Sequence, residues 1–516
     1  MSNDEIKQLH DFYDLNFVDD KMKVSLNKLK IMRKIKAMGY YRYDTPDGAT
    51  QYVYINNGKI SISNPIQMKD AFEDYVKSLP TRTDVKVDSE DENSAPTIPI
   101  SAEFLLNKLY QNLPKYLSPE IFDRCRPDAP IELLKDDRAK KYLYFKNTAV
   151  VVSADGVQPI PYSAMQDFNG YVWDNGILEH DFVYTPVEGD FEHFVNDICS
   201  NDPQRKLSLM SMLGYLMHDY YICDNRAVLL TDASNDEIGV NAGRTGKGLL
   251  GKALSQMLNK NTNIDKRYCA INGKDIDLKK DTRYSLADIS TQLIHIEDIS
   301  KHVDFEDLFN DITDGAIIRK PYQVKPIKKM VKIMISTNRT IDISNETSKM
   351  GRVYIFELAN YYNANYSPVD KYGRRFFSED WTSQDWICFY SFMCRCIQVY
   401  LTNGVQIVNN SEYRIRELLE STNQDFIYWL NEVIDYKHKT EQKYIKKTLW
   451  DSFFDKYPSF STMRPATLTA WAKKYFNYKN IDFVEMRSTD DIFVIYPTAA
   501  TRATATAKKN SLRNIC

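Results

Sequence analysis

Three short apolar runs in the middle of the chain have the pattern of buried strands. They cover residues 227–231, 292–297 and 331–336, and each is rich in Ile, Leu, Val or Met. Strands covered on both faces, as in a parallel sheet flanked by helices, give such runs. The pattern therefore predicts an α/β core with a parallel sheet, which we place in residues 226–403.

The N-terminal part shows both strand and helix patterns. Residues 40–43 and 51–55 alternate as strands do around a turn at 44–48, and a helical pattern follows at 68–79. Residues 21–36 interleave seven Lys and Arg with apolar residues. They are predicted to form a basic helix, with either a solvated face or a nucleic-acid contact. We therefore expect a small α/β module here.

Changes in composition divide the rest of the chain. The stretch 81–98 is polar and acidic, as linkers are. Helical patterns at 191–199 and 207–221 precede the core, and three helical patterns with two strand patterns follow it, as in a winged-helix fold. The expected domains are an α/β module with its linker (1–98), a mostly helical domain (99–225), the core (226–403), a winged-helix-like domain (404–500) and a disordered tail (501–516).

The overall composition is that of a soluble globular protein. Hydrophobic residues make up 43% and charged residues 27%, and the net charge is −3. A nucleic-acid site must therefore be a local basic patch. Eight cysteines without a C-x-x-C pair, together with seven histidines, argue against zinc and for a reducing cytoplasm. The apolar run at 386–401 is too short to span a bilayer and is predicted to be a buried helix.

A glycine-containing loop follows the first core strand and runs into a helical pattern. The sequence from Asn241 to Gly248 approaches G-x-x-x-x-G-K-[ST], the loop that binds phosphates through backbone N–H groups and a lysine. It departs from that pattern at both of these ends, because Gly is expected at 241 and Ser or Thr at 248. The candidate nucleotide-binding residues are Asn241, Gly243, Arg244, Thr245, Gly246, Lys247, Gly248 and Leu249.

Polar residues end the next core strands. Glu297 and Asp298 follow the second apolar run, where carboxylates can bind a metal and activate water. Asn338 follows the third run and can hydrogen-bond both a water and a γ-phosphate. Arg352 lies 14 residues further on, before another apolar run. It is either an ordinary surface residue or, in a ring of subunits, an arginine finger.

A basic stretch separates the carboxylates from Asn338. Residues 315–332 contain six Lys and Arg, two prolines and no acid, which favours a hairpin over a helix. Basic side chains with an aromatic suit single-stranded DNA, although a solvent-facing charged strand pair has the same composition. The candidate DNA-binding residues are Arg319, Lys320, Tyr322, Lys325, Lys328 and Lys329.

The order of these motifs resembles the superfamily-3 helicases. Lys247 is followed by the two carboxylates, a basic hairpin, Asn338 and Arg352, and the match extends over roughly residues 200–400. More narrowly, the chain is similar to phage and viral primase-helicases of the poxvirus NTPase type. The resemblance implies a P-loop, AAA+-like motor that forms a ring, usually a homo-hexamer, and moves on DNA with ATP and Mg²⁺.

The resemblance also implies roles for single residues. Lys247 would bind the β- and γ-phosphates, and Asn338 would sense the nucleotide. Glu297 and Asp298 would share metal binding and water activation, with no choice made between them. Arg352 would act as a finger on a neighbouring subunit. Two other candidates for that finger are Arg374 and Arg375.

The departures from the loop pattern leave alternatives open. Gly248 lacks the hydroxyl that normally binds Mg²⁺, so the metal must rely on carboxylates, water and phosphate, or Thr245 must compensate. We therefore expect an active ATPase with weaker magnesium affinity. Asn241 is tolerable because Asn accepts left-handed backbone angles. No primase site is evident, so a separate primase or polymerase is expected. The alternatives to a replicative helicase are a DNA-packaging or loader ATPase and a non-catalytic nucleic-acid-binding scaffold with a degenerate loop.

Overall fold

The computed structural model divides into two compact units, each described here by itself. One comprises residues 1–136, 142–151 and 158–182, and the other comprises 137–141, 152–157 and 183–516. The structure describes residues 12–18, 21–44, 50–82, 99–164, 170–221, 225–233, 244–259, 267–274, 276–278, 280, 282–299, 305–320, 326–338, 351–408, 411–434, 441–486 and 491–496.

The first unit begins with an antiparallel strand pair and a helix. β1 (Tyr13–Val18) pairs with β2 (Lys21–Leu26), and α2 (Lys28–Ala37) starts after Asn27, whose side chain accepts from Leu29 N and Lys30 N. The prediction of one basic helix over 21–36 is therefore wrong in its first part. Residues 21–26 alternate polar and apolar side chains, which is the period of a strand rather than of a helix.

Two small sheets and several helices follow α2 in the described chain as far as Trp173. The expected strand pair at 40–43 and 51–55 is confirmed as part of a four-stranded sheet of order β3-β4-β5-β9. A three-stranded sheet of order β6-β7-β8 follows in the sequence. These elements are β3 (Tyr40–Asp44), β4 (Thr50–Asn56), β5 (Lys59–Ser63), α3 (Pro65–Lys77), α4 (Ala102–Tyr110), α5 (Leu113–Tyr116), α6 (Pro119–Phe122), β6 (Lys140–Tyr144), β7 (Ala149–Ser153), β8 (Gly156–Ile160) and β9 (Val172–Trp173).

The second unit is built on a five-stranded parallel sheet of order β11-β12-β15-β10-β16. The expected α/β core with a parallel sheet is therefore confirmed. Every residue of β10 and β15 is buried, as their apolar runs predicted. The strands are β10 (Ala227–Asp232), β11 (Tyr268–Asn272), β12 (Leu293–Glu297), β15 (Lys332–Ser336) and β16 (Val353–Leu358).

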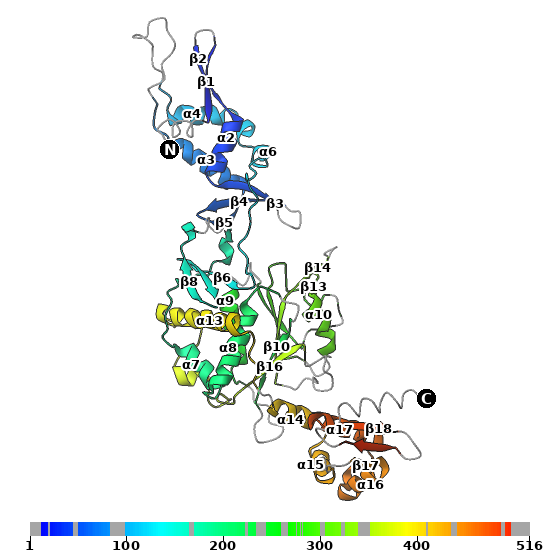
Figure 1. Cartoon of the computed structure of the whole chain (residues 1–516). Helices are drawn as coiled ribbons and strands as arrows, with labels where there is room; N and C mark the ends of the chain where they lie inside the picture. Colours follow the sequence, from blue (N-terminus) through cyan, green and yellow to red (C-terminus); the bar gives the residue numbers. More distant parts are fainter. Residues whose placement is uncertain are drawn as a thin grey trace. The chain divides into compact units, whose positions relative to one another are not determined.

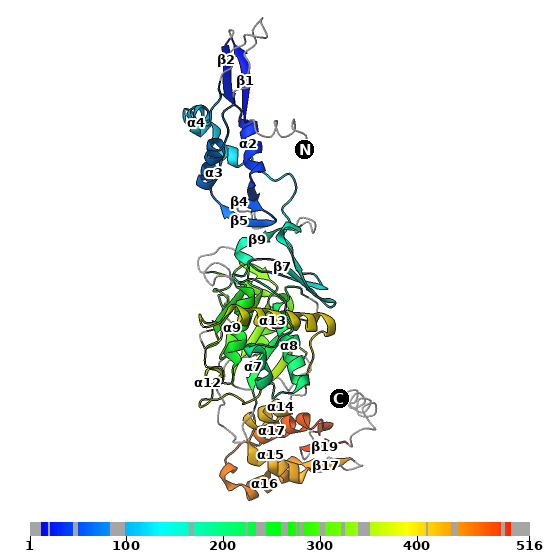
Figure 2. The ribbon, with the colours of Figure 1, turned by 90° about the vertical axis from the view of Figure 1, so that its left-hand side faces the viewer.

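Helices cover both faces of this sheet. Figures 1 and 2 show α7, α8, α9 and α13 on one face, and Figure 1 shows α10 (Phe309–Asp314) on the other. α8 and α13 approach so closely that a Cβ at Gly214 would lie 2.2 Å from the Cys396 carbonyl oxygen. The four helices are α7 (Asp190–Ile198), α8 (Pro203–Met217), α9 (Lys247–Leu258) and α13 (Ser383–Asn403).

The C-terminal part packs helices on a small antiparallel sheet of order β17-β19-β18. The three expected helices and the terminal strand pair are present, and β17 and α14 were not predicted. The elements are α14 (Ser411–Glu420), α15 (Gln424–Val433), β17 (Gln442–Ile445), α16 (Lys446–Lys456), α17 (Pro465–Tyr478), β18 (Phe483–Met486) and β19 (Ile492–Ile495).

The two compact units divide the chain differently from the expected domains. The segment 99–225 was expected to be one mostly helical domain. Instead, residues 99–136 belong to the first unit, α7 and α8 belong to the second, and strands β6 to β9 lie between them in sequence. The helices α7 and α8 pack on α13, as in the contact of Glu192 with Arg395, 203 positions later in the chain. Local periodicity does not reveal such contacts. Within the described residues, no helix is long and apolar enough to cross a membrane.

Candidate nucleotide site

Three strands of the parallel sheet bring polar residues to one edge. β10 ends at Asp232, β12 ends at Glu297, and Asn338 follows β15 by two residues. The register pairs Leu230 and Glu297 with Ser336, so the carboxyl ends of the three strands are level. α9 begins at this edge with Lys247. Open α/β sheets bind ligands at this position.

The loop before α9 has the backbone of a tight turn. Arg244 and Gly246 have φ angles of 70° and 113°. A Cβ at Gly246 would lie 2.6 Å from the ring of Phe194, so both the angle and the space require glycine there. A Cβ at Gly248 would meet no atom of the described residues within 4 Å. Two predicted loop residues, Asn241 and Gly243, lie outside the described residues.

The first turn of α9 is suited to an anion. Gly246 at its N-cap makes no side-chain capping hydrogen bond, and the first turn contains no acidic residue. N–H groups at a helix start lack intrahelical partners, and the helix dipole is positive there. Phosphate groups bind at such ends. Leu249, the last predicted loop residue, lies within this turn.

The side chain of Lys247 joins two of the strand ends. Its Nζ donates hydrogen bonds to Asp232 Oδ1 and to Asn338 Oδ1. Lys247 is 9% exposed and Asp232 is 3% exposed. Burial lowers the pKa of Lys247, and the carboxylate of Asp232 opposes that effect. The structure thus brings Lys247 and Asn338 together, as the order of the motifs predicted.

Asp232 was not among the predicted site residues. Its Oδ1 also accepts a hydrogen bond from Thr245 Oγ1, while its buried Oδ2 has no hydrogen-bond partner among the described residues. The signal in the sequence was an acidic residue at the end of an otherwise apolar strand. A buried carboxylate needs a countercharge, and here Lys247 supplies it.

Arg416 is a second residue that the sequence did not point to. It comes from α14, and its guanidinium donates to the backbone oxygen of Asp232 and, at 2.9 Å, to Thr231 Oγ1. It therefore attaches α14 to the end of β10, beside the buried ion pair. The two residues are separated by 184 positions in the chain, which explains why no local pattern could indicate the contact.

The predicted pair Glu297 and Asp298 lies at the end of β12 and is partly exposed. Burial and the neighbouring Asp298 both raise the pKa of Glu297. Asp298 has a φ of 53°, and its backbone N–H donates to Ser336 O at 2.9 Å. A carboxyl with a raised pKa can accept a proton more readily than an ordinary glutamate. No three acidic, His or Cys side chains in the described part of the chain group as a metal cage.

A buried histidine lies in β12, two residues before Glu297. His295 Nε2 lies 2.8 Å from Ser336 Oγ, and its Nδ1 lies 2.6 Å from Tyr268 OH. Burial lowers the pKa of His295 to about 3, so the ring is neutral at pH 7. A Cβ at Gly251 on α9 would lie 2.8 Å from this ring. The close fit fixes α9 against β12 and hence Lys247 relative to Glu297.

Arg352 lies at the other end of the sheet. It directly precedes β16, whose first residue is level with Ala227 at the start of β10. Its guanidinium is 4.6 Å from the ring centroid of Phe309. The strand β10 therefore separates Arg352 from Lys247 of the same chain. Of the alternative fingers, Arg374 pairs with Asp385 and Asp190 at 2.7 Å, which commits it to packing within the chain.

The predicted basic hairpin is present. β13 (Ala316–Ile318) pairs in antiparallel fashion with β14 (Ile327–Lys329). Lys320 and Lys328 are exposed, and Lys329 Nζ donates to Ile289 O at 2.6 Å. Lys332, the last basic residue of the stretch, is buried in β15. The other DNA-binding candidates are Arg319, which is half-buried, and Tyr322 and Lys325, which lie outside the described residues.

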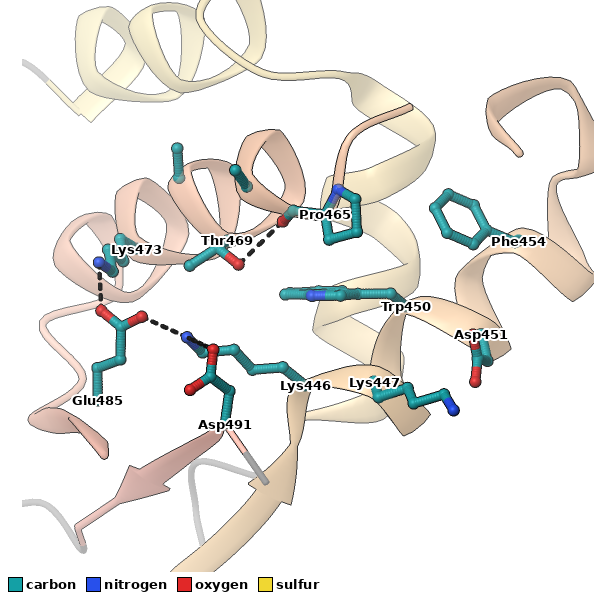
Figure 3. A pocket seen from close by; sticks show the side chains of 12 residues that line it. Lys446, Lys447, Trp450, Asp451, Phe454, Pro465, Thr469, Lys473, Glu485 and Asp491 are labelled. Carbon is teal, nitrogen blue, oxygen red and sulfur yellow. Dashed lines mark hydrogen bonds and ion pairs between the residues drawn. The ribbon is translucent and has the colours of Figure 1, made fainter. Parts of the chain in front are cut away.

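A separate cavity of about 600 Å³ lies in the C-terminal part, between α16 and α17 (Figure 3). Its charges are balanced internally. Lys446 pairs with Glu485 and lies 3.9 Å from Asp491, and Lys473 pairs with Glu485 at 2.5 Å. These two lysines hold the pKa of Glu485 down at about 2. Because its charges neutralise each other, this cavity is a poor site for phosphate.

Comparison with protein families and with curated protein sequences finds no match. Among solved structures, the chain is similar to two apo structures of the NrS-1 C-terminal region. One is 14% identical with a TM-score of 0.31, covering 70% of this chain and 97% of that one. The other is 12% identical with a TM-score of 0.32, covering 69% and 96%. A structure of Drosophila ORC bound to DNA is 10% identical with a TM-score of 0.19, covering 62% and 92%. Likeness at this level says nothing about activity.

Proposed function

We propose that the chain is an ATP-dependent DNA motor of the superfamily-3 helicase type, with its ATPase site at the carboxyl edge of the parallel sheet. The observation that carries the proposal is the position of Lys247. Its ammonium group, at the start of an uncapped helix, meets Asn338 from a second strand. Glu297 ends the strand beside that one. A phosphate cradle, a polar sensor and a base then share one edge of the sheet.

The chain's own residues account for the main steps. The N–H groups at the start of α9 bind the phosphates, and Lys247 turns from Asp232 to the β- and γ-phosphates. Asn338 then loses its bond to Lys247 and is available to the γ-phosphate or the attacking water. Glu297, with its raised pKa, accepts the proton of that water.

The residues at this edge suit Mg²⁺ with help from the nucleotide. Carboxylate oxygens are its preferred protein ligands, and it usually keeps waters and phosphate oxygens as well. With Glu297 as the proposed base, Asp298 is the proposed ligand, and Oδ2 of Asp232, which has no hydrogen-bond partner among the described residues, is a further buried acceptor. When bound, the ion would neutralise charge on the phosphates.

Movement on DNA is the less direct part of the proposal. The exposed lysines of the β13–β14 hairpin support a contact with the phosphate backbone. The distance of Arg352 from Lys247 along β10 supports action on a neighbouring subunit, in a homo-hexameric ring. The order of helices and strands from α15 to β19 supports a winged-helix domain at the C-terminal end. A separate primase or polymerase would supply primers.

One observation favours a second candidate function. Gly248 faces open space and offers no hydroxyl to a metal, as in a nucleic-acid-binding scaffold that does not hydrolyse ATP. A DNA-packaging or loader ATPase would use the same site as the helicase, and only its action on DNA would differ.

A single set of assays separates these functions. Lys247→Ala should abolish DNA-stimulated ATP hydrolysis, while the exposed control Lys447→Ala should leave it unchanged. Wild-type protein with ATP should displace a strand from a forked DNA. Hydrolysis without displacement would favour the packaging or loader motor. DNA binding without hydrolysis would favour the scaffold, and full activity in Lys247→Ala would exclude this site.

A further inference from the structure

A second hollow opens beside the first turns of α9, the helix that begins with Lys247. It has a volume of about 380 Å³ and lies between the first two turns of α9 and the segment 368–378. Leu249 and Lys252 line it from the helix, and Val369, Arg375 and Phe377 line it from the segment. Cavities of roughly 300–1,000 Å³ are typical of small-molecule sites. The size alone therefore permits a ligand.

The hollow continues the proposed phosphate site. Leu249 and Lys252 are the second and fifth residues after Lys247 on the same helix. With a rise of about 1.5 Å per residue, they lie within about 8 Å of Lys247 along the helix axis. They are also three positions apart, so they share one face of α9. A ligand whose phosphates contact the start of α9 can reach this face.

The opposite wall is held in a fixed shape. Arg374 makes two 2.7 Å bonds to Asp385 and one to Asp190, which ties the segment to α13 and α7. Phe377 adopts a φ of 60°, which a bulky side chain rarely does. Backbone strain of this kind is concentrated at ligand clamps and active sites. The hollow is therefore a preformed feature rather than a loose gap between side chains.

The charge of the hollow favours an anionic ligand. Its lining contains no carboxylate. Lys252 and Arg375 bring two positive charges to the lining. The charge of Lys252 also acts on Glu297, where it opposes the rise in pKa that burial causes. Leu249, Val369 and Phe377 supply apolar surface beside these two cations. The lining thus combines a place for a flat apolar group with two donors for oxygen atoms.

We propose that this hollow receives the nucleoside part of the nucleotide whose phosphates bind at Lys247. The base packs against Val369 and Phe377, and Lys252 and Arg375 donate hydrogen bonds to oxygens of the sugar. This inference rests on the proposed ATPase site and names its specificity pocket. Arg375 thereby acquires a role in binding within its own subunit, in place of a finger on a neighbour.

The experiment compares two ligands that share phosphates but differ in the nucleoside. Binding of ATP and of inorganic triphosphate is measured by titration calorimetry on the full chain. Val369→Trp fills the hollow, and Arg375→Ala removes one cation. Two control variants make the same substitutions at exposed residues outside the hollow. Val187→Trp is the control for Val369→Trp, and Arg464→Ala is the control for Arg375→Ala.

Both variants of the hollow should weaken ATP binding about tenfold, or about 1.4 kcal/mol, and leave triphosphate binding unchanged. The two controls should bind both ligands as wild type does. Unchanged ATP binding in the two hollow variants would overturn the inference and leave the ATPase proposal standing. An equal loss for both ligands, or a selective loss of single-stranded DNA binding, would also overturn the inference.

If Val369→Trp does not fold, Arg375→Ala decides alone. Lys247→Ala tests the proposed ATPase site separately from the hollow. Normal binding of both ligands in that variant would contradict the ATPase site itself.

Discussion

Lys247 and Asp232 form a buried ion pair at the carboxyl edge of the central sheet, and Asn338 shares the same ammonium group. Two groups that the proposed site would offer to a nucleotide are therefore engaged with each other. In the proposed mechanism, phosphate oxygens take the place of Asp232 at Lys247. The free energy of the pair would then be part of the affinity for nucleotide.

Asp232→Asn should destabilise the nucleotide-free protein. The substitution leaves a buried lysine without its countercharge, and breaking a buried pair from one side costs about 3 kcal/mol. Urea unfolding measures this loss. In a double-mutant cycle, Lys247→Met should recover part of it, because both charges are then absent. The control is Glu432→Gln, which breaks the exposed pair of Glu432 with Lys456 and should cost under about 1 kcal/mol. Equal effects at the two positions would show that the Lys247–Asp232 pair does not stabilise the fold.

Gly248→Ser should leave the fold intact and should raise the apparent affinity of the protein for magnesium. A Cβ there meets no atom within 4 Å in the part of the chain that the structure describes, so the serine hydroxyl has room beside the proposed phosphate site. Mg²⁺ titrations of ATP hydrolysis should show half-maximal activity at a lower metal concentration than in wild type. Gly246→Ser is the matched contrast, since its Cβ would lie 2.6 Å from Phe194 at a φ of 113°. That variant should lose more than about 2 kcal/mol of stability. An unchanged magnesium dependence in Gly248→Ser would mean that position 248 does not face the metal.

Local patterns predicted the elements that are continuous in the sequence. The runs ending at Thr231 and Glu297 became buried parallel strands because strands covered on both faces need apolar side chains throughout. The ends of parallel strands meet at one edge, so the meeting of Lys247 and Asn338 followed from the order of elements. Local patterns could not predict contacts between residues far apart in the chain, such as the contact of Arg416 with the end of β10.

Charge along the sequence also gave an incomplete view of exposure. Lys332 belongs to the basic stretch 315–332, yet the structure buries it inside β15. Its Nζ lies 3.1 Å from Asn225 Oδ1 and 3.9 Å from the ring centroid of Tyr215. The composition of the stretch predicted either a DNA contact or a solvent-facing charged strand pair. Only the strand pairing shows which lysines reach solvent.

The free energy of unfolding should rise between pH 7 and about 10 because of the titration of Lys332. Burial lowers its pKa from 10.5 to about 7, while Asp219 opposes the shift. In this range the unfolded chain keeps a proton that the folded protein has lost, so acidification favours unfolding. The stability gained over the range is on the order of 3–5 kcal/mol. Unfolding free energies of wild type and Lys332→Met, measured at pH 7 and pH 10, give the difference. The Met variant should show a smaller gain, whereas equal gains would mean that Lys332 titrates normally.

Arg352 can be tested as a residue that acts on a neighbouring subunit. It lies at the opposite end of β10 from Lys247, so within one chain the two residues do not share a site. Lys247→Ala and Arg352→Ala should each abolish ATP hydrolysis in homogeneous rings. In an equal mixture, some interfaces combine an intact Lys247 from one subunit with an intact Arg352 from the next. Random head-to-tail assembly makes these roughly a quarter of all interfaces, and activity should return to about that fraction.

The packing of Arg352 on Phe309 supplies the contrary outcome of the mixing experiment. If the cation–π contact is the main role of Arg352, Arg352→Ala should lower the melting temperature and the mixture should stay inactive. Phe309→Leu then serves as the control, because it weakens the same contact and keeps the guanidinium. A finger that acts in trans should survive Phe309→Leu with most of its activity. Loss of activity in Phe309→Leu and no recovery in the mixture would assign Arg352 to the support of β16.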